Sequence, residues 1–142
     1  MNHPKYSVII PVYNRPDEVD DLLNSLTKQT TKDFEVIIVE DGSTIPCDGI
    51  IEQYKEVLPI AYYTKPNSGP GTTRNHGAQK ANGDYFIFFD SDCIIPPDYF
   101  QQVNQELKSN LVDAFGGPDT THPTFTPIQK AISYSMTSFL TT

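Results

Sequence analysis

The sequence is short of several residue types, and each shortage excludes a class of protein. Its 142 residues include no tryptophan and only two cysteines, Cys47 and Cys93, which are too few for a disulfide framework. Basic residues are also scarce: 10 Lys and Arg stand against 18 Asp and Glu, and the net charge of -8 argues against nucleic acid or an anionic membrane as the main partner. No apolar run reaches the length of a transmembrane helix, and the N-terminus lacks the basic-then-apolar pattern of a signal peptide. We therefore expect a cytosolic protein with unbridged thiols, whose attachment to the inner face of a membrane would need parts outside this sequence.

The sequence instead contains a regular alternation of predicted strands and helices. Its length fits one domain over residues 1–142, with a single hydrophobic core. Runs of β-branched and aromatic residues predict strands, and apolar residues at helical spacing predict helices between them. Strands are expected at residues 6–13, 34–39, 61–63, 85–89 and 112–117, and helices at 17–26, 50–58, 72–81, 100–107 and 128–139. This order predicts an α/β fold, with a largely parallel sheet flanked by helices.

The strand at residues 85–89 ends on two carboxylates. Its five consecutive apolar or aromatic residues predict a strand buried on both faces, as in the interior of a parallel sheet. Asp90 and Asp92 follow, and residues i and i+2 of an extended backbone point to the same side. Two carboxylates held together repel each other unless a cation lies between them, and Mg²⁺ or Mn²⁺ often binds one or two carboxylates plus substrate phosphates. The pattern indicates a metal and phosphate site, although Asp-Ser-Asp is also a common solvated turn; Cys93 is interpreted as a buried, inert thiol.

The ends of the predicted strands share a chemical character. The first strand ends at residues 11–14, the second at Glu40 and Asp41, and the later one at Asp90 and Asp92. Ligands of open parallel sheets bind outside the carboxyl ends of the strands. Polar and acidic residues therefore gather at the edge where a binding site is expected.

Four short motifs in a fixed order resemble the family 2 glycosyltransferases. They cover roughly the first 120 residues, and each is weak alone but specific in combination. The motifs are Val8–Asn14, Val39–Ser43, Asn67–Gly71 with Arg74–Gly77, and Gly83–Tyr85 leading to Asp90-Ser91-Asp92. The resemblance implies the GT-A fold, whose Rossmann-like half binds a nucleotide-sugar, usually a UDP-sugar, with Mn²⁺ or Mg²⁺.

The resemblance also implies roles for individual nucleotide-binding residues. Pro11 and Tyr13 would line the base and ribose pocket, and Asp41 would accept a hydrogen bond from uracil. Arg74 would approach the base or the diphosphate, and Asp90 would lie near the ribose. The alternatives without a binding role are that residues 41–43 form a turn and helix cap and that Arg74 is a surface side chain.

The resemblance also implies a metal ligand and a catalytic base. Asp92 would coordinate the divalent cation, while Glu40 occupies a position where the family often has a second Asp. Inverting members use a carboxylate base well downstream of the Asp-x-Asp motif, and no matching acidic motif follows here. We therefore expect an N-terminal, nucleotide-sugar-binding portion of a longer enzyme, lacking its acceptor half and inactive alone. Its acceptor would be a sugar or lipid-linked hydroxyl, and apolar surface left open by the missing part would favour self-association.

Two other functions remain open at this point. A sugar nucleotidyltransferase of similar fold would carry a Gly-rich, basic phosphate loop after the first strand, where this chain has Asn14-Arg15-Pro16. A non-catalytic receiver-like signalling module would hold Mg²⁺ in its acidic cluster and would need a phosphorylatable Asp near a Lys and a Thr. Binding of uridine nucleotides would separate both from a glycosyltransferase. His76 is interpreted as a packing or surface residue.

Overall fold

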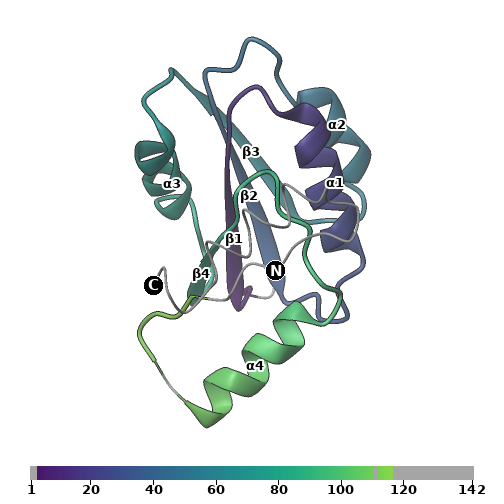
Figure 1. Cartoon of the computed structure of the whole chain (residues 1–142), viewed down its shortest axis with the longest axis vertical. Coiled ribbons are helices and arrows are strands. Elements are labelled where there is room, and N and C mark those ends of the chain that lie inside the picture. The colour runs from purple at the N-terminus through teal and green to yellow at the C-terminus, as the bar shows by residue number, and fades with distance from the viewer. Residues whose placement is uncertain (1–2, 111, 117–142) are drawn as a thin grey trace, which may run out of the picture. The chain divides into compact units, whose positions relative to one another are not determined.

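The computed structural model describes residues 3–110 and 112–116. Strands and helices alternate in this part of the chain (Figure 1), and their bounds are β1 Tyr6–Val12, α1 Pro16–Thr27, β2 Phe34–Asp41, α2 Asp48–Tyr54, β3 Ile60–Lys65, α3 Pro70–Ala78, β4 Tyr85–Phe88 and α4 Tyr99–Ser109. The chain divides into two compact units, Met1–Glu106 and Leu107–Thr142. The first unit holds the sheet and the candidate site.

The four strands form one parallel sheet in the order β3-β2-β1-β4. β1 lies between β2 and β4, with Ile9 paired to Ile37 on one side and to Phe88 on the other. All strands run the same way, so their carboxyl ends meet at one edge of the sheet. The prediction of a parallel α/β fold is confirmed.

Helices cover both faces of this sheet, and side-chain size decides how closely they pack. Figure 1 shows α3 on one face and α1 with α2 on the other. On α1 the fully buried leucines and valine lie at helical spacing: Val19, Leu22, Leu23 and Leu26. α3 instead turns small residues toward the sheet, and a Cβ on Gly77 would lie 2.5 Å from Cγ2 of Ile9. A glycine is thus what allows α3 to approach β1 so closely.

Aromatic rings close the amino end of the sheet. Phe100, at the start of α4, stacks on Phe34 with ring centroids 4.6 Å apart, and its centroid lies 5.4 Å from that of Tyr6. Tyr6 and Phe34 are the first residues of β1 and β2. This end of the sheet is filled with side chains, which leaves the carboxyl edge as the place for a ligand.

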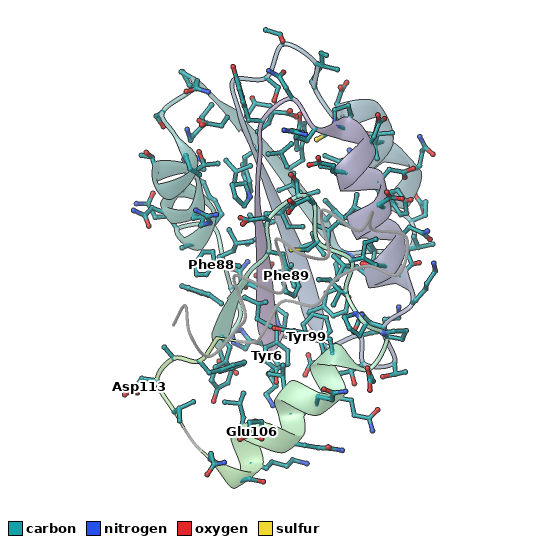
Figure 2. The ribbon with its side chains drawn as sticks, viewed as in Figure 1. Tyr6, Phe88, Phe89, Tyr99, Glu106 and Asp113 are labelled. Carbon is teal, nitrogen blue, oxygen red and sulfur yellow. The ribbon has the colours of Figure 1, made fainter. Side chains whose placement is uncertain are left out.

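The prediction that the strand at residues 85–89 is buried on both faces is wrong. β4 is an edge strand of the described sheet, and Phe86 and Phe88 are 49% and 47% exposed. Phe89 takes the opposite side and packs against Tyr99 at a centroid distance of 5.3 Å (Figure 2). A continuous apolar run fits a central strand as well as an edge strand, so the sequence pattern could not separate them.

Three smaller predictions also differ from the structure. The second helix stops at Tyr54 rather than Leu58, and Val57 is 61% exposed beyond it. Residues 112–116 form no strand, and the helix predicted at 128–139 lies outside the described residues. Cys93 is half-buried rather than buried, and it is not bridged to Cys47. No helix within residues 3–110 and 112–116 has the length and apolar character needed to cross a bilayer.

Candidate functional site

The loops at the carboxyl edge of the sheet carry the side chains singled out from the sequence. Pro11, near the end of β1, is half-buried, while Tyr13 just beyond the strand is 50% exposed. His76 on α3 is half-buried with its ring edge-on to Tyr63, at 6.1 Å between centroids, which fits the packing role expected for it. The remaining residues fall into three clusters at this edge.

Asn14 forms the first cluster by joining the loop after β1 to the loop after β2. Its backbone N–H donates to Ser43 Oγ at 2.8 Å, and its Oδ1 accepts the N–H groups of Thr44 and Ile45 at 2.7 and 3.0 Å. Its φ of 55° lies in the left-handed region, which Asn tolerates better than most residues. The sequence analysis included Asn14 in the first motif but assigned it no role, although an Asn shortly after a strand is a signal for this conformation.

Asp41 forms the second cluster and is almost fully enclosed. Its Oδ1 accepts the Ser68 N–H and its Oδ2 the Gly69 N–H, both at 2.9 Å, and Lys65 Nζ forms an ion pair with Oδ1. Burial acts to raise the pKa of Asp41, but the bonds from Lys65, Ser68 and Gly69 outweigh it and hold the pKa below its ordinary value. The prediction placed Asp41 correctly at the edge but missed Lys65, which ends β3.

Glu40 precedes Asp41 but serves the opposite face of the sheet, because successive strand residues point to opposite sides. Its Oε2 accepts the Cys47 backbone N–H at 3.1 Å and the Cys47 thiol at 3.2 Å, and it also accepts the Tyr62 hydroxyl. Burial acts to raise the pKa of Glu40, but the nearby Ser43 hydroxyl, Tyr62 and Cys47 lower it overall. Glu40 thus fixes the loop before α2 from the far face.

The same contacts make the Cys47 thiol unreactive. Burial, together with the Glu40 carboxylate, raises the pKa of Cys47 to about 12. A thiol with so high a pKa carries almost no thiolate at neutral pH, and the thiolate is the nucleophile and metal ligand. Cys47 is therefore a packing residue.

Arg74 and Asp90 form the third cluster, an ion pair between α3 and the segment after β4. β4 ends at Phe88, and the Cys93 N–H donates to the Asp90 carbonyl at 3.2 Å, so Asp90 and Asp92 lie in a turn. The prediction that an extended backbone aligns the carboxylates of Asp90 and Asp92 is therefore wrong. The cation found beside Asp90 is the Arg74 guanidinium, and Asp92 is exposed.

These carboxylates offer a divalent metal few protein ligands. In the described part of the chain, no three His, Cys, Asp or Glu side chains gather closely enough to hold a metal ion. The site therefore offers no all-protein metal cage. An exposed Asp92, two residues after Asp90, fits the other mode, in which one or two carboxylates and substrate phosphates share a Mg²⁺ or Mn²⁺ ion.

Comparison with known proteins decides the family. The model of the family described as glycosyl transferase family 2 matches residues 7–140. The chain belongs to this family. The resemblance seen in the sequence motifs is confirmed.

Curated relatives of this family 2 chain are much longer. An uncharacterized glycosyltransferase of Rickettsia bellii is 44% identical over 108 residues, which are 76% of this chain and 15% of that protein. The poly(ribitol-phosphate) beta-glucosyltransferase of Bacillus spizizenii is 41% identical over 114 residues, or 77% of this chain and 18% of that protein. The chain thus spans less than a fifth of the length of either relative.

Solved structures extend the family likeness to the fold. Residues 1–349 of TarS from S. aureus, in complex with UDP-GlcNAc, match with a TM-score of 0.72 and 32% identity, covering 81% of this chain and 37% of that one. The mannosyltransferase PcManGT from Pyrobaculum calidifontis, in complex with GDP-Man and Mn²⁺, matches with a TM-score of 0.67 and 22% identity, over 75% of this chain and 33% of that one. The second likeness shows the fold alone. The predicted fold class agrees with these neighbours.

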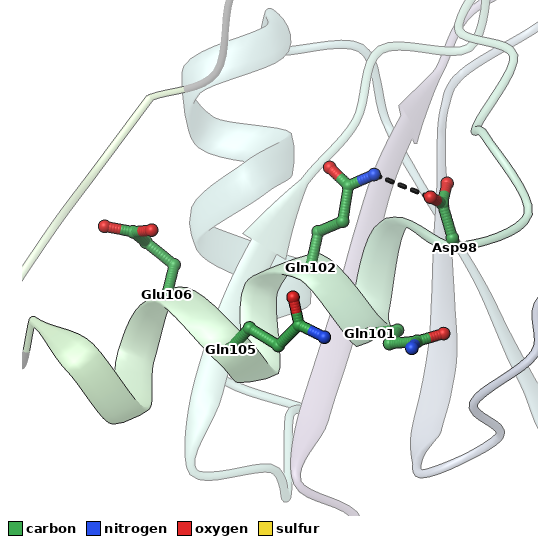
Figure 3. A pocket seen from close by; sticks show the side chains of 5 residues that line it. All are labelled: Asp98, Gln101, Gln102, Gln105 and Glu106. Atoms are coloured by element: carbon green, nitrogen blue, oxygen red, sulfur yellow. Dashed lines mark hydrogen bonds between the residues drawn. The ribbon is translucent and has the colours of Figure 1, made fainter.

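A polar hollow elsewhere on this family 2 chain is not the candidate site. It measures about 520 Å³ and is lined by side chains of α4 and the residue before it: Asp98, Gln101, Gln102, Gln105 and Glu106 (Figure 3). Within it, Gln102 Nε2 donates to Asp98 at 2.6 Å. α4 starts beside the aromatic rings at the amino end of the sheet, whereas ligands of parallel sheets bind at the carboxyl end.

Proposed function

We propose that the carboxyl edge of the sheet binds the donor of a glycosyltransferase, a sugar carried on UDP, together with Mn²⁺ or Mg²⁺. The observation that carries this proposal is the Arg74–Asp90 ion pair, which brings α3 to the turn containing Asp92. It puts a guanidinium and carboxylates at the edge where a parallel sheet takes nucleotides. Support comes from the family membership and from TarS, whose structures hold UDP-GlcNAc and UDP.

The proposed roles follow the order of the loops. Pro11 and the exposed ring of Tyr13 line the base and ribose, and Asp41 accepts a hydrogen bond from the base. Arg74 leaves Asp90 to contact the diphosphate, because a guanidinium binds phosphate oxygens with paired hydrogen bonds. Asp90 then faces the ribose.

Asp92 is the proposed metal ligand. The bound cation offsets the charge that develops on the departing nucleoside diphosphate. Since the chain is acidic overall, this local positive charge matters for holding a diphosphate at all. The whole enzyme would transfer the sugar to a sugar or lipid-linked hydroxyl with inversion, using a base that is not among the residues assigned here. We also propose that the protein is cytosolic.

Calorimetric titration of UDP into the chain, with and without Mn²⁺, tests the proposal. We expect Mn²⁺ to tighten binding, and Asp92→Asn to remove most of that gain. Asp84→Asn is the matched control, because it removes the same charge from an exposed residue before β4, at the opposite edge of the sheet. UDP binding that ignores Mn²⁺, or that both variants weaken equally, would refute the metal role of Asp92. No UDP binding by the folded chain would refute the donor site.

A further inference from the structure

Lys65 holds the carboxylate that is proposed to receive the base. Its ammonium contacts Asp41 Oδ1, Ser68 Oγ at 2.5 Å and the Pro66 carbonyl at 3.1 Å. These three acceptors match the three donors of an ammonium group. The Lys65 side chain is only 11% exposed, so its position is fixed by the protein rather than by solvent.

The contacts leave Asp41 with little capacity for a ligand. A carboxylate offers about four acceptor positions, two on each oxygen. Oδ1 receives both Lys65 and the Ser68 N–H, while Oδ2 receives the Gly69 N–H. The Thr73 hydroxyl also contributes a hydrogen bond to Asp41. Oδ1 already takes two donors, so the acceptor capacity that a ligand could use lies on Oδ2, on a side chain that is 6% exposed.

Nucleobases differ in how many donors they bring to such a carboxylate. The pairing edge of uracil has one imide N–H between two carbonyl groups. The pairing edge of guanine has a ring N–H next to an amino group, two adjacent donors that fit the two oxygens of a free carboxylate. With Oδ1 occupied, the second guanine donor would face the Lys65 ammonium without an acceptor, which costs binding energy.

We propose that Lys65 is a specificity-determining residue, which makes Asp41 select uracil over guanine by occupying Oδ1. This inference rests on the proposed function, because it requires the base to approach Asp41. Lys65 acts through Asp41 and through the Ser68-Gly69 loop that both residues hold. Loss of Lys65 is therefore expected to change the preference between nucleotides rather than the overall affinity.

The test compares UDP and GDP binding, with Mn²⁺, to the wild-type chain and to Lys65→Met, which keeps the length of the side chain and removes its charge. We expect wild type to prefer UDP, and Lys65→Met to reduce the ratio of the two affinities by about tenfold, the effect of one hydrogen bond. Lys65→Arg should keep the preference, because it keeps a donor on Oδ1. Lys32→Met, an exposed lysine before β2, controls for the lost charge.

The outcomes separate this inference from the proposed function. An unchanged UDP-to-GDP ratio in folded Lys65→Met overturns the role of Lys65 while leaving the UDP site in place. If Lys65→Met does not fold, the wild-type ratio still decides, because equal affinity for UDP and GDP overturns the role. If neither nucleotide binds the folded wild-type chain, the proposed function itself fails.

Discussion

Asn14 shows how one residue can join two loops at the carboxyl edge of the sheet, where the nucleotide is proposed to bind. Its left-handed backbone turns the chain after β1, and its side-chain oxygen accepts two N–H groups from the loop after β2. The exposed Tyr13 directly precedes this turn. Two loops proposed to hold the nucleotide are therefore fixed by a single amide side chain.

Replacing Asn14 separates its two contributions. Asn14→Ala loses both the backbone tolerance and the acceptor, and should lower the free energy of unfolding by about 1–2 kcal/mol. Asn14→Gly loses only the acceptor, so it should lower the free energy of unfolding by less. Asn14→Asp keeps an acceptor, so it should bind UDP as the wild-type chain does. Urea denaturation with UDP titration measures both effects. Equal stability of the Ala and Gly variants would show that the left-handed conformation contributes nothing.

Asp41 should make the stability of the chain depend on acid pH. Its pKa is lowered in the folded state from an ordinary 3.8, because the bonds from Lys65, Ser68 and Gly69 outweigh the opposing effect of burial. A carboxyl with a lowered folded pKa stabilises the protein above its unfolded pKa, and that contribution is lost as pH falls through the folded value.

Asp41→Asn provides the measurement. We expect wild type to be more stable than Asp41→Asn at neutral pH, and the difference to shrink as pH drops below about 3.8. Urea denaturation at several pH values gives both curves. The pKa of Glu40 is lowered too, so the variant should still lose some stability in acid. A difference that stays constant down to the lowest pH would contradict the contribution of Asp41.

At the scale of elements, the close packing of α3 on the sheet positions Arg74. A Cβ on Gly77 would lie 2.5 Å from Ile9 Cγ2, whereas one on Gly71 of the same helix would meet nothing within 4 Å. Gly77→Ala should push α3 outward, lower the free energy of unfolding by about 1–3 kcal/mol and weaken UDP binding. Gly71→Ala should leave stability unchanged or raise it, since Ala favours helix.

Thermal unfolding and UDP titration of the two glycine variants test this packing argument. Gly71→Ala is the control for Gly77→Ala, because both substitutions add one methyl group to the same helix. Equal stability of the two variants would mean that α3 is free to shift on the sheet. UDP binding lost in Gly77→Ala without any loss of stability would point to a direct role for this position.

At the scale of the whole molecule, β4 leaves an apolar edge open. Phe86 and Phe88 are about half exposed on a strand whose only described neighbour is β1. Exposed apolar edge strands promote pairing between chains. We expect concentration-dependent self-association, which Phe86→Thr with Phe88→Thr should reduce while keeping strand propensity. Sedimentation across a range of concentrations tests this, and a monomer throughout would contradict it.

The strands, helices and site edge could be predicted from the sequence because local patterns determine them. The β-branched runs of β1 and β2 and the helical spacing on α1 fixed the element order, and the strand-end rule placed Asp41 and Asp90 at one edge. Arg74 was indicated only by the resemblance to the family 2 glycosyltransferases. The edge position of β4 and the Lys65–Asp41 pair could not be predicted, because both depend on which strands become neighbours. The turn that contains Asp90 and Asp92 could not be predicted either, because it depends on where β4 ends.

The central claim is that the nucleotide binds at the carboxyl edge of the sheet, and amide NMR spectra of the isotope-labelled chain test it most directly. UDP with Mg²⁺ is titrated, since Mg²⁺ does not broaden the signals as Mn²⁺ does. We predict that shifts cluster in the loops of this edge, at residues 13–15, 41–45, 66–74 and 89–92. Shifts that cluster at the opposite edge or along α4, with these loops unchanged, would contradict the account.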